Sequence, residues 1–201
     1  MPDWDEDSPQ LRKNLAYVLE EIARAAEQRQ IPTLAAARRW QTLVMEGLET
    51  PNLRFVGAFR GEPGLENVQV KVGLNYGVNS VNVAEALRRF EEKLQALVAQ
   101  LDALLPIGQE LDSDHLAAIV DLCAWVHAEW VRIHPFANGN GRTGCLWANS
   151  LAMRYGLPPF IRLRSRPNAG YADAGAKAMQ GEWKPTAVVF RRLLEAFLEE
   201  I

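Results

Sequence analysis

The sequence has few cysteines, few histidines and no pattern typical of a metal site. Its 201 residues include two cysteines, Cys123 and Cys145, and three histidines, which do not occur at the spacing of a zinc site. A chain of this length can bury a sizeable core, so it needs no disulfide for stability. We interpret both cysteines as free thiols.

An excess of charge of one sign is also lacking. The 22 basic and 25 acidic residues give a formal net charge of −3, without a basic block. This balance favours neither nucleic acid nor an anionic membrane as a partner. No apolar run reaches the length of a membrane-spanning helix, and the acidic start MPDWDEDSPQ lacks the apolar core of a secretory signal. We therefore expect a cytoplasmic protein, with export by a system that reads no such signal as the alternative.

Helical periodicity dominates what is present. Apolar residues recur at helical spacing from Pro9 almost to the C-terminus. Only residues 54–73 alternate apolar and polar positions, in RFVGAFRG and NVQVKVG around the turn-forming EPGLE, which predicts one β-hairpin. The sequence therefore predicts an all-α, mainly helical single domain over residues 1–201. Helices would precede the hairpin in residues 1–50 and form a core in 82–200.

The joint between two predicted helices, EWVRIHPFANGNGRTGCLWAN, is unusually polar. A helix beginning near Arg142 has backbone N–H groups without partners in its first turn, and its dipole adds partial positive charge there. Gly139 and Gly141 let an anion approach the backbone, and Arg142 adds a cationic fork suited to phosphate. The pattern indicates a phosphate-binding site.

His134 lies at the other side of this joint, at the end of the preceding helix. We expect the negative end of the helix dipole to favour the imidazolium, and a histidine placed there can accept a proton near neutral pH. The amides of Asn138 and Asn140 can hydrogen-bond an oxygen or offer one to a hard cation. Together these groups suit the attack of a hydroxyl on phosphorus. A plain Gly/Asn turn with an exposed histidine is the alternative.

The string HPFANGNGR resembles the signature of Fic-domain proteins. That signature reads His, any residue, Phe, any residue, Asp or Glu, Gly-Asn-Gly-Arg, two residues and Arg. The element order, with a hairpin beginning VGAFR before two helices, agrees over about residues 30–200. The resemblance implies a helical fold with a hairpin "flap". It also implies transfer of AMP from ATP, with Mg²⁺, to a Tyr, Thr or Ser hydroxyl of a target protein or of the chain itself.

The resemblance also implies residue roles. His134 would be the general base, and a buried Phe136 would hold the loop. The nucleotide's phosphates would bind at Gly139, Asn140, Gly141 and Arg142. The hairpin would present the target as an added strand, a mode that relies on backbone hydrogen bonds. Val68, Val70 and Val72, which alternate onto one face of the predicted hairpin, would belong to this docking flap.

Two positions depart from the signature. Asn138 replaces the acidic residue that holds Mg²⁺ in the family, so we expect a weakened metal site. Cys145 replaces the second Arg, which removes a charge-assisted contact of about 1.5–3 kcal/mol with the terminal phosphates. These departures leave two alternatives open. The first is a Fic-fold transferase that uses another donor and transfers UMP, phosphocholine or a phosphoryl group. The second is a weakly active protein that binds a nucleotide or a partner.

The segment TLVMEG fits an inhibitory pattern of the family, in which a glutamate enters the nucleotide site. Thr42 and Glu46 would then lie one turn apart on one helix face. Their expected partner, the second Arg, is Cys145 here. A solvated glutamate near a helix end, terminated by Gly47, is the other interpretation.

Overall fold

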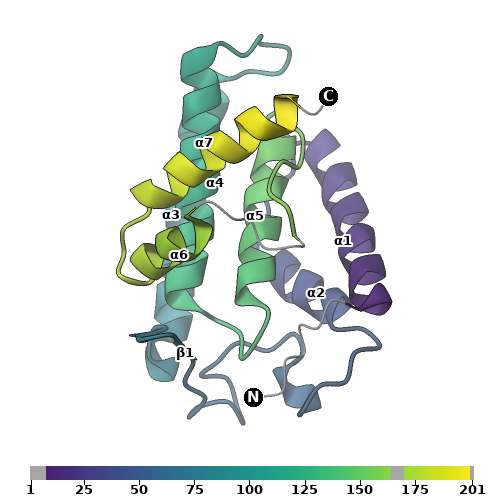
Figure 1. Ribbon diagram of the computed structural model, residues 1–201, viewed down its shortest axis with the longest axis vertical. Helices are drawn as coiled ribbons and strands as arrows, with labels where there is room; N and C mark the ends of the chain where they lie inside the picture. Colours follow the sequence, from purple (N-terminus) through teal and green to yellow (C-terminus); the bar gives the residue numbers. More distant parts are fainter. Residues whose placement is uncertain (1–7, 164–169, 200–201) are drawn as a thin grey trace.

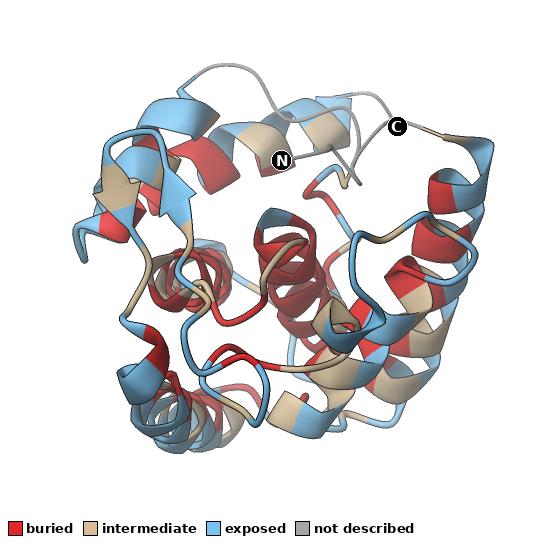
Figure 2. Cartoon of the chain, turned by 90° about the horizontal axis from the view of Figure 1, so that it is seen from below, coloured by how far each residue is buried: buried red, intermediate tan, exposed pale blue. Residues whose placement is uncertain are grey.

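Two helices form the centre of the computed structural model, which describes residues 8–163 and 170–199. They are α4 (Ser113–Ile133) and α5 (Asn140–Arg154), and they lie side by side (Figure 1). Every residue of α5 except Gly141 and Met153 is buried. Figure 2 shows buried residues in red around the centre and exposed faces turned outward. The joint between these two helices is therefore held by the most deeply buried part of the fold.

The remaining helices surround this pair. Helices α1 (Pro9–Glu27) and α2 (Leu34–Val44) pack against α5. Helices α3 (Val83–Leu104), α6 (Tyr171–Met179) and α7 (Lys184–Glu199) pack against α4. Short 3₁₀ turns, η1 (Leu53–Phe55) and η2 (Ser80–Asn82), flank the region of the hairpin. The mainly helical fold with one small antiparallel hairpin is confirmed.

Local sequence explains where the first helices begin. The Ser8 hydroxyl accepts a hydrogen bond from the Leu11 N–H at 3.1 Å, and Pro9 takes the first helical position, where its missing N–H costs nothing. The Thr33 hydroxyl accepts from the Ala36 N–H at 3.2 Å. Both side chains satisfy backbone donors that the helix leaves unpaired.

The position predicted for the hairpin is wrong. Its strands are β1 (Lys71–Val72) and β2 (Asn75–Tyr76), with Lys71 opposite Tyr76 and Val72 opposite Asn75. Only the last residues of the predicted range 54–73 therefore belong to a strand. Val72 lies on β1, whereas Val68 and Val70 precede it.

Close backbone packing explains why residues 54–61 form no strand. Gly57 and Gly61 have φ values of +70° and +90°, in the left-handed region that favours glycine. A Cβ at Gly61 would collide with the carbonyl of Ser80, and one at Gly57 with the Thr42 hydroxyl. The two glycines thus bend the chain over its neighbours, which apolar alternation alone does not reveal.

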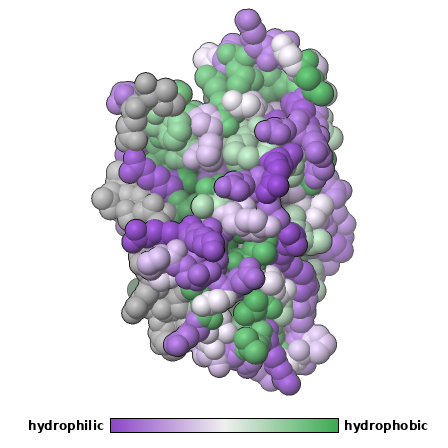
Figure 3. Space-filling model, turned by 90° about the vertical axis from the view of Figure 1, so that its right-hand side faces the viewer, coloured by the Kyte–Doolittle hydropathy of each residue, from purple (hydrophilic) through white to green (hydrophobic). Residues whose placement is uncertain are grey.

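The surface mixes polar and apolar side chains. The face in Figure 3 shows hydrophilic areas interspersed with smaller hydrophobic ones. Within residues 8–163 and 170–199, no helix is both long enough and apolar enough to cross a membrane.

Candidate active site

The α4–α5 joint turns on two residues with left-handed backbone conformations. His134 ends α4 with φ 53° and ψ 56°, and Gly139 precedes α5 with φ 84° and ψ 8°. Helix α5 begins at Asn140, two residues before the expected start. A left-handed conformation is uncommon for a residue other than glycine, so the fold must hold His134 in place.

The His134 imidazole is arranged as a neutral base. Its Nδ1 lies 2.8 Å from the Val131 carbonyl oxygen. A carbonyl only accepts, so this bond requires the proton on Nδ1 and leaves a lone pair on Nε2. Burial lowers the pKa of His134, and the charge of Arg60 lowers it further, against the opposing effect of the Val131 bond. The expectation that the helix end favours the imidazolium is therefore wrong, because burial outweighs it.

Phe136 and Asn140 give the loop its shape. Phe136 is fully buried, with its ring centroid 4.8 Å from that of Phe59 and 5.8 Å from that of Trp130. The Asn140 Oδ1 accepts from the Phe136 N–H at 2.8 Å, and its Nδ2 donates to the Phe136 carbonyl at 2.8 Å. Because this buried amide holds the loop through both its oxygen and its nitrogen, we expect Asn140 to bind an anion through its backbone N–H.

The first turn of α5 is fixed against α4. The Thr143 N–H donates to the Gly139 carbonyl at 2.9 Å, and the Trp130 Nε1–H donates to the Thr143 hydroxyl at 2.8 Å. A Cβ on Gly139 would lie 3.3 Å from an Arg142 Nη atom, so the guanidinium lies against the loop. Backbone amides and a guanidinium thus meet at one helix end, an arrangement that binds anions.

A cavity of about 820 Å³ opens beside this joint. Its size falls within the range of about 300–1,000 Å³ for small-molecule sites. The predicted site residues that line it are His134, Asn138, Gly139, Asn140, Gly141 and Arg142, with Val70 and Val72 of the hairpin region. Val68, Thr42 and Glu46 do not line it. The structure therefore brings the predicted base and phosphate-binding residues together.

The residues of this cavity do not fit a protein-held Mg²⁺. The Asn138 Oδ1 accepts from the Gly139 N–H at 2.5 Å, and the Asn140 Oδ1 accepts from the Phe136 N–H, so both amide oxygens proposed for a cation already hold the loop. No Asp or Glu is among the described residues that line the cavity, and the described part of the chain contains no cluster of three or more metal-ligating side chains. Magnesium prefers charged oxygen ligands beside phosphate oxygens. We therefore derive no step through a metal ion.

The other end of the cavity carries a neutral polar cluster that sequence reasoning missed. The Tyr171 hydroxyl lies 2.8 Å from His127 Nε2 and 3.3 Å from Cys145 Sγ. Burial lowers the pKa of His127 to about 4, so its ring is neutral at pH 7. Because Tyr171 lies 26 residues beyond Cys145, no local pattern indicates their contact.

The predicted inhibitory pair is not arranged on one helix. Helix α2 ends at Val44, so Glu46 lies beyond it and is exposed. The Thr42 hydroxyl donates to the Arg38 carbonyl within the helix at 3.0 Å. The side chain that reaches the loop before α5 is that of Met45. Its Cε would lie only 3.1 Å from a Cβ added to Gly139, so Met45 packs against this glycine. Inhibition by Glu46 stays a prediction of the sequence pattern, and in the conformation described here the side chain lies outside the cavity.

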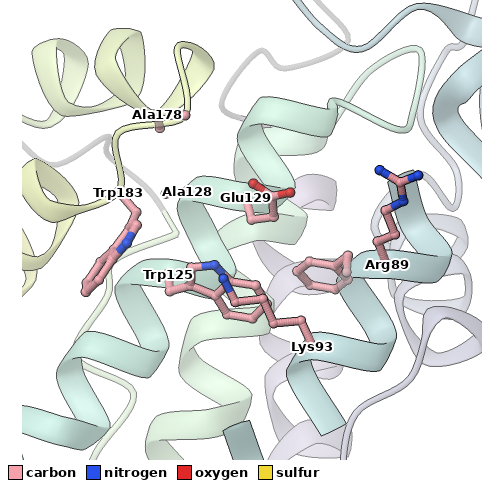
Figure 4. Close-up of a pocket in the computed structure, with 9 residues that line it drawn as sticks. Arg89, Lys93, Trp125, Ala128, Glu129, Ala178 and Trp183 are labelled. Carbon is pink, nitrogen blue, oxygen red and sulfur yellow. The ribbon is translucent and has the colours of Figure 1, made fainter. Parts of the chain in front are cut away.

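A second, smaller hollow lies between α3, α4 and the segment after α6 (Figure 4). It measures about 210 Å³ and is lined by Trp125 and Trp183. Its cations are already engaged: the Lys93 Nζ lies 4.9 Å from the Trp125 ring centroid, and Arg89 pairs with Glu85 at 2.7 Å. No histidine lines this hollow among the described residues, so we place the candidate chemistry in the larger cavity.

Comparisons with known proteins find relatives of part of this chain. The protein adenylyltransferase Fic of Drosophila persimilis is 47% identical over 77 residues, which are 37% of this chain and 15% of that protein. The corresponding protein of Drosophila yakuba is 43% identical over 63 residues, 30% of this chain and 13% of that protein. The chain thus matches less than a sixth of the length of these curated relatives.

Solved structures show the same fold. A Fic domain-containing signalling protein of Bacteroides thetaiotaomicron aligns with a TM-score of 0.63 at 19% identity, over 92% of this chain and 69% of that one. The N-terminal FIC domain of Bep8 from Bartonella sp. 1-1C gives 0.59 at 20%, over 89% and 84%. The model of the Fic/DOC family matches residues 32–152. The chain therefore belongs to the Fic/DOC family.

Proposed function

We propose that the protein transfers AMP from ATP to a Ser, Thr or Tyr hydroxyl of a target protein or of itself. One observation carries the proposal: His134 and the N-terminus of α5 line the same cavity. A proton acceptor and an anion-binding helix end are the two groups that attack on a phosphate requires.

The proposed step follows from this geometry. The phosphates lie on the first-turn amides of α5 and against Arg142, and the target hydroxyl lies near His134 Nε2. Nε2 takes the hydroxyl proton while the hydroxyl oxygen attacks the α-phosphorus. The bond between that phosphorus and the bridging oxygen breaks, and pyrophosphate leaves with the electron pair. Because the lowered pKa keeps His134 neutral, the base is available at neutral pH.

The target would dock on the hairpin. Val72, Leu74 and Tyr76 are 46%, 92% and 64% exposed, and Val72 and Leu74 also line the cavity. A two-stranded hairpin retains a free edge on each strand, so an extended segment of the target can add to it. Docking there would bring a hydroxyl side chain to the mouth of the cavity.

Asn138 and Cys145 favour a second candidate, transfer from another donor. A cavity without a carboxylate, and with Cys145 in place of the second arginine of the family motif, suits a donor of lower charge than ATP, such as a nucleotide-linked phosphocholine. UTP, which has the same triphosphate charge as ATP, is the other alternative donor. A thermal-shift screen with ATP, UTP and CDP-choline, each with and without Mg²⁺, separates these donors. If only a donor other than ATP stabilises the protein, AMP transfer is excluded and the second candidate is favoured.

The direct test is mass spectrometry of the protein and of a lysate incubated with ATP. We expect a mass increase of one AMP with the wild type and with His115→Gln, a histidine outside the cavity, and a loss of about 10²-fold or more with His134→Ala. Modification that survives His134→Ala would refute the proposed base. Absence of any adduct with every donor would leave only a binding role for this fold.

A further inference from the structure

We propose that Arg60 is a positioning residue that fixes His134 relative to the hairpin, so that the base keeps a constant position relative to the docked target. This inference rests on the proposed function. Arg60 lies between η1 and β1 and is 1% exposed. It contributes nothing to the lining of the cavity among the described residues, so it acts through other groups and not on the substrate.

Arg60 binds three successive carbonyls at the end of α4. Its backbone N–H donates to Pro135 O at 2.7 Å, its Nε to His134 O at 2.7 Å, and its Nη2 to Ile133 O at 2.9 Å. The last carbonyls of a helix have no partners within the helix. Here Arg60 binds the carbonyl of His134, the residue with the left-handed backbone conformation, and the carbonyls of the residues before and after it. The conformation that aims the imidazole is therefore held by Arg60.

The same guanidinium binds both ends of the hairpin. Nη1 donates to Val68 O at 3.2 Å, before β1, and Nη2 donates to Val78 O at 2.8 Å, after β2. The Val78 N–H in turn donates to Ile133 O at 3.2 Å. A Cβ on Gly77 would lie 2.7 Å from the His134 Cβ. The base and the stem of the hairpin are thus in direct contact.

The chemistry of arginine explains why this residue type is required. The Arg60 side chain donates four hydrogen bonds to carbonyl oxygens that lie in three directions. The planar guanidinium, with its five N–H donors, can make all of these bonds, whereas the single ammonium of lysine cannot. Within the described residues Arg60 forms no ion pair. Its charge acts on His134, whose cavity is also lined by Arg142 and Arg162.

Two variants of Arg60 test the proposal. Arg60→Lys keeps the charge and loses the fork, and Arg60→Gln loses both. Misplacing a catalytic group by about 1 Å can cost up to about 10²-fold, so we expect kcat to fall at least about tenfold in both, with the KM for the donor changed by less than about twofold. Arg54→Lys, at an exposed arginine in the nearby turn η1, is the control and should keep the wild-type rate.

Imidazole NMR gives a readout that does not depend on transfer. The chain has three histidines, so three signals are assigned with His115→Gln and His127→Gln. We expect the pKa of His134 to rise slightly in Arg60→Lys and further in Arg60→Gln, because exposure increases and then the positive charge is lost. The titration of His115 should stay unchanged. Gly77→Ala keeps the Arg60 side chain but inserts a methyl group 2.7 Å from the His134 Cβ and 3.0 Å from an Arg60 Nη atom, so it should shift the same His134 signal.

Each outcome decides the question. Folded Arg60→Lys with wild-type kcat and a wild-type His134 titration would overturn the proposal. If Arg60→Gln does not fold, Arg60→Lys and Gly77→Ala still decide it by the same readouts. If the wild type transfers nothing from any donor, the proposed function fails while the NMR titrations still show whether Arg60 holds His134.

Discussion

The two ends of the cavity differ in charge. At one end, a neutral base, backbone amides and Arg142 surround the loop after α4. At the other end, Cys145, Tyr171 and His127 form a hydrogen-bonded cluster without a cation. In the proposed function the first end would serve proton transfer and bind one phosphate, whereas at the second end the neutral Cys145 replaces the second arginine of the family motif.

The largest expected effect tests whether the His127 end is neutral. Burial lowers the pKa of His127 to about 4 in the folded protein, whereas an exposed histidine in the unfolded chain has a pKa of about 6.5, so the unfolded chain takes up a proton first as pH falls. Stability that is present above pH 6.5 is then lost progressively down to about pH 4, by up to about 3 kcal/mol. Urea unfolding at pH 7 and pH 5 measures this loss. His127→Gln should flatten the pH dependence, and an equally steep dependence would assign the loss to other groups.

Arg142 tests the charged end. Arg142→Gln removes charge-assisted hydrogen bonds of about 1.5–3 kcal/mol, so we expect donor affinity to fall about 10- to 100-fold by calorimetry. The affinity of the wild type should weaken with added salt more than that of the variant. Arg89→Gln, in the smaller hollow, is the matched control. Equal donor affinity in the wild type and in Arg142→Gln would show that the charge of Arg142 does not contribute to donor binding.

Asn138 tests the absence of a metal ligand. We expect Mg²⁺ to change the donor Kd of the wild type less than about twofold, because the cavity offers no carboxylate. Asn138→Asp should bind the donor about tenfold more tightly with Mg²⁺ than with EDTA. Asn138→Ala is the control: it removes the hydrogen bond to the Gly139 N–H without adding a charge, so it separates the two effects of Asn138→Asp on donor affinity. A strong Mg²⁺ dependence in the wild type would show that another ligand set exists.

Glu46 gives the smallest expected effect. It is exposed and lies outside the cavity, so Glu46→Gly should change the transfer rate less than about twofold, as should the control Glu49→Gly. An increase of more than about tenfold, specific to Glu46, would show that this side chain enters the site in a conformation different from the one described.

Local patterns predicted much of this molecule, and distant contacts decided the rest. Caps and periodicity located the helices, and the GNG motif located the joint, because these signals depend on neighbouring residues. The bend at Gly57 and Gly61 depends on Thr42 and Ser80, and so the hairpin was misplaced. The cluster at Tyr171 and the role of Arg60 likewise depend on partners 26 to 74 residues away, which no local pattern indicates.

A crystal structure with a non-hydrolysable ATP analogue tests the central claim most directly. The account predicts phosphate oxygens on the first-turn N–H groups of α5 and the α-phosphorus within about 6 Å of His134 Nε2, which leaves room for one hydroxyl oxygen between them. Phosphates bound elsewhere, or an imidazole that faces away from the phosphorus, would contradict it.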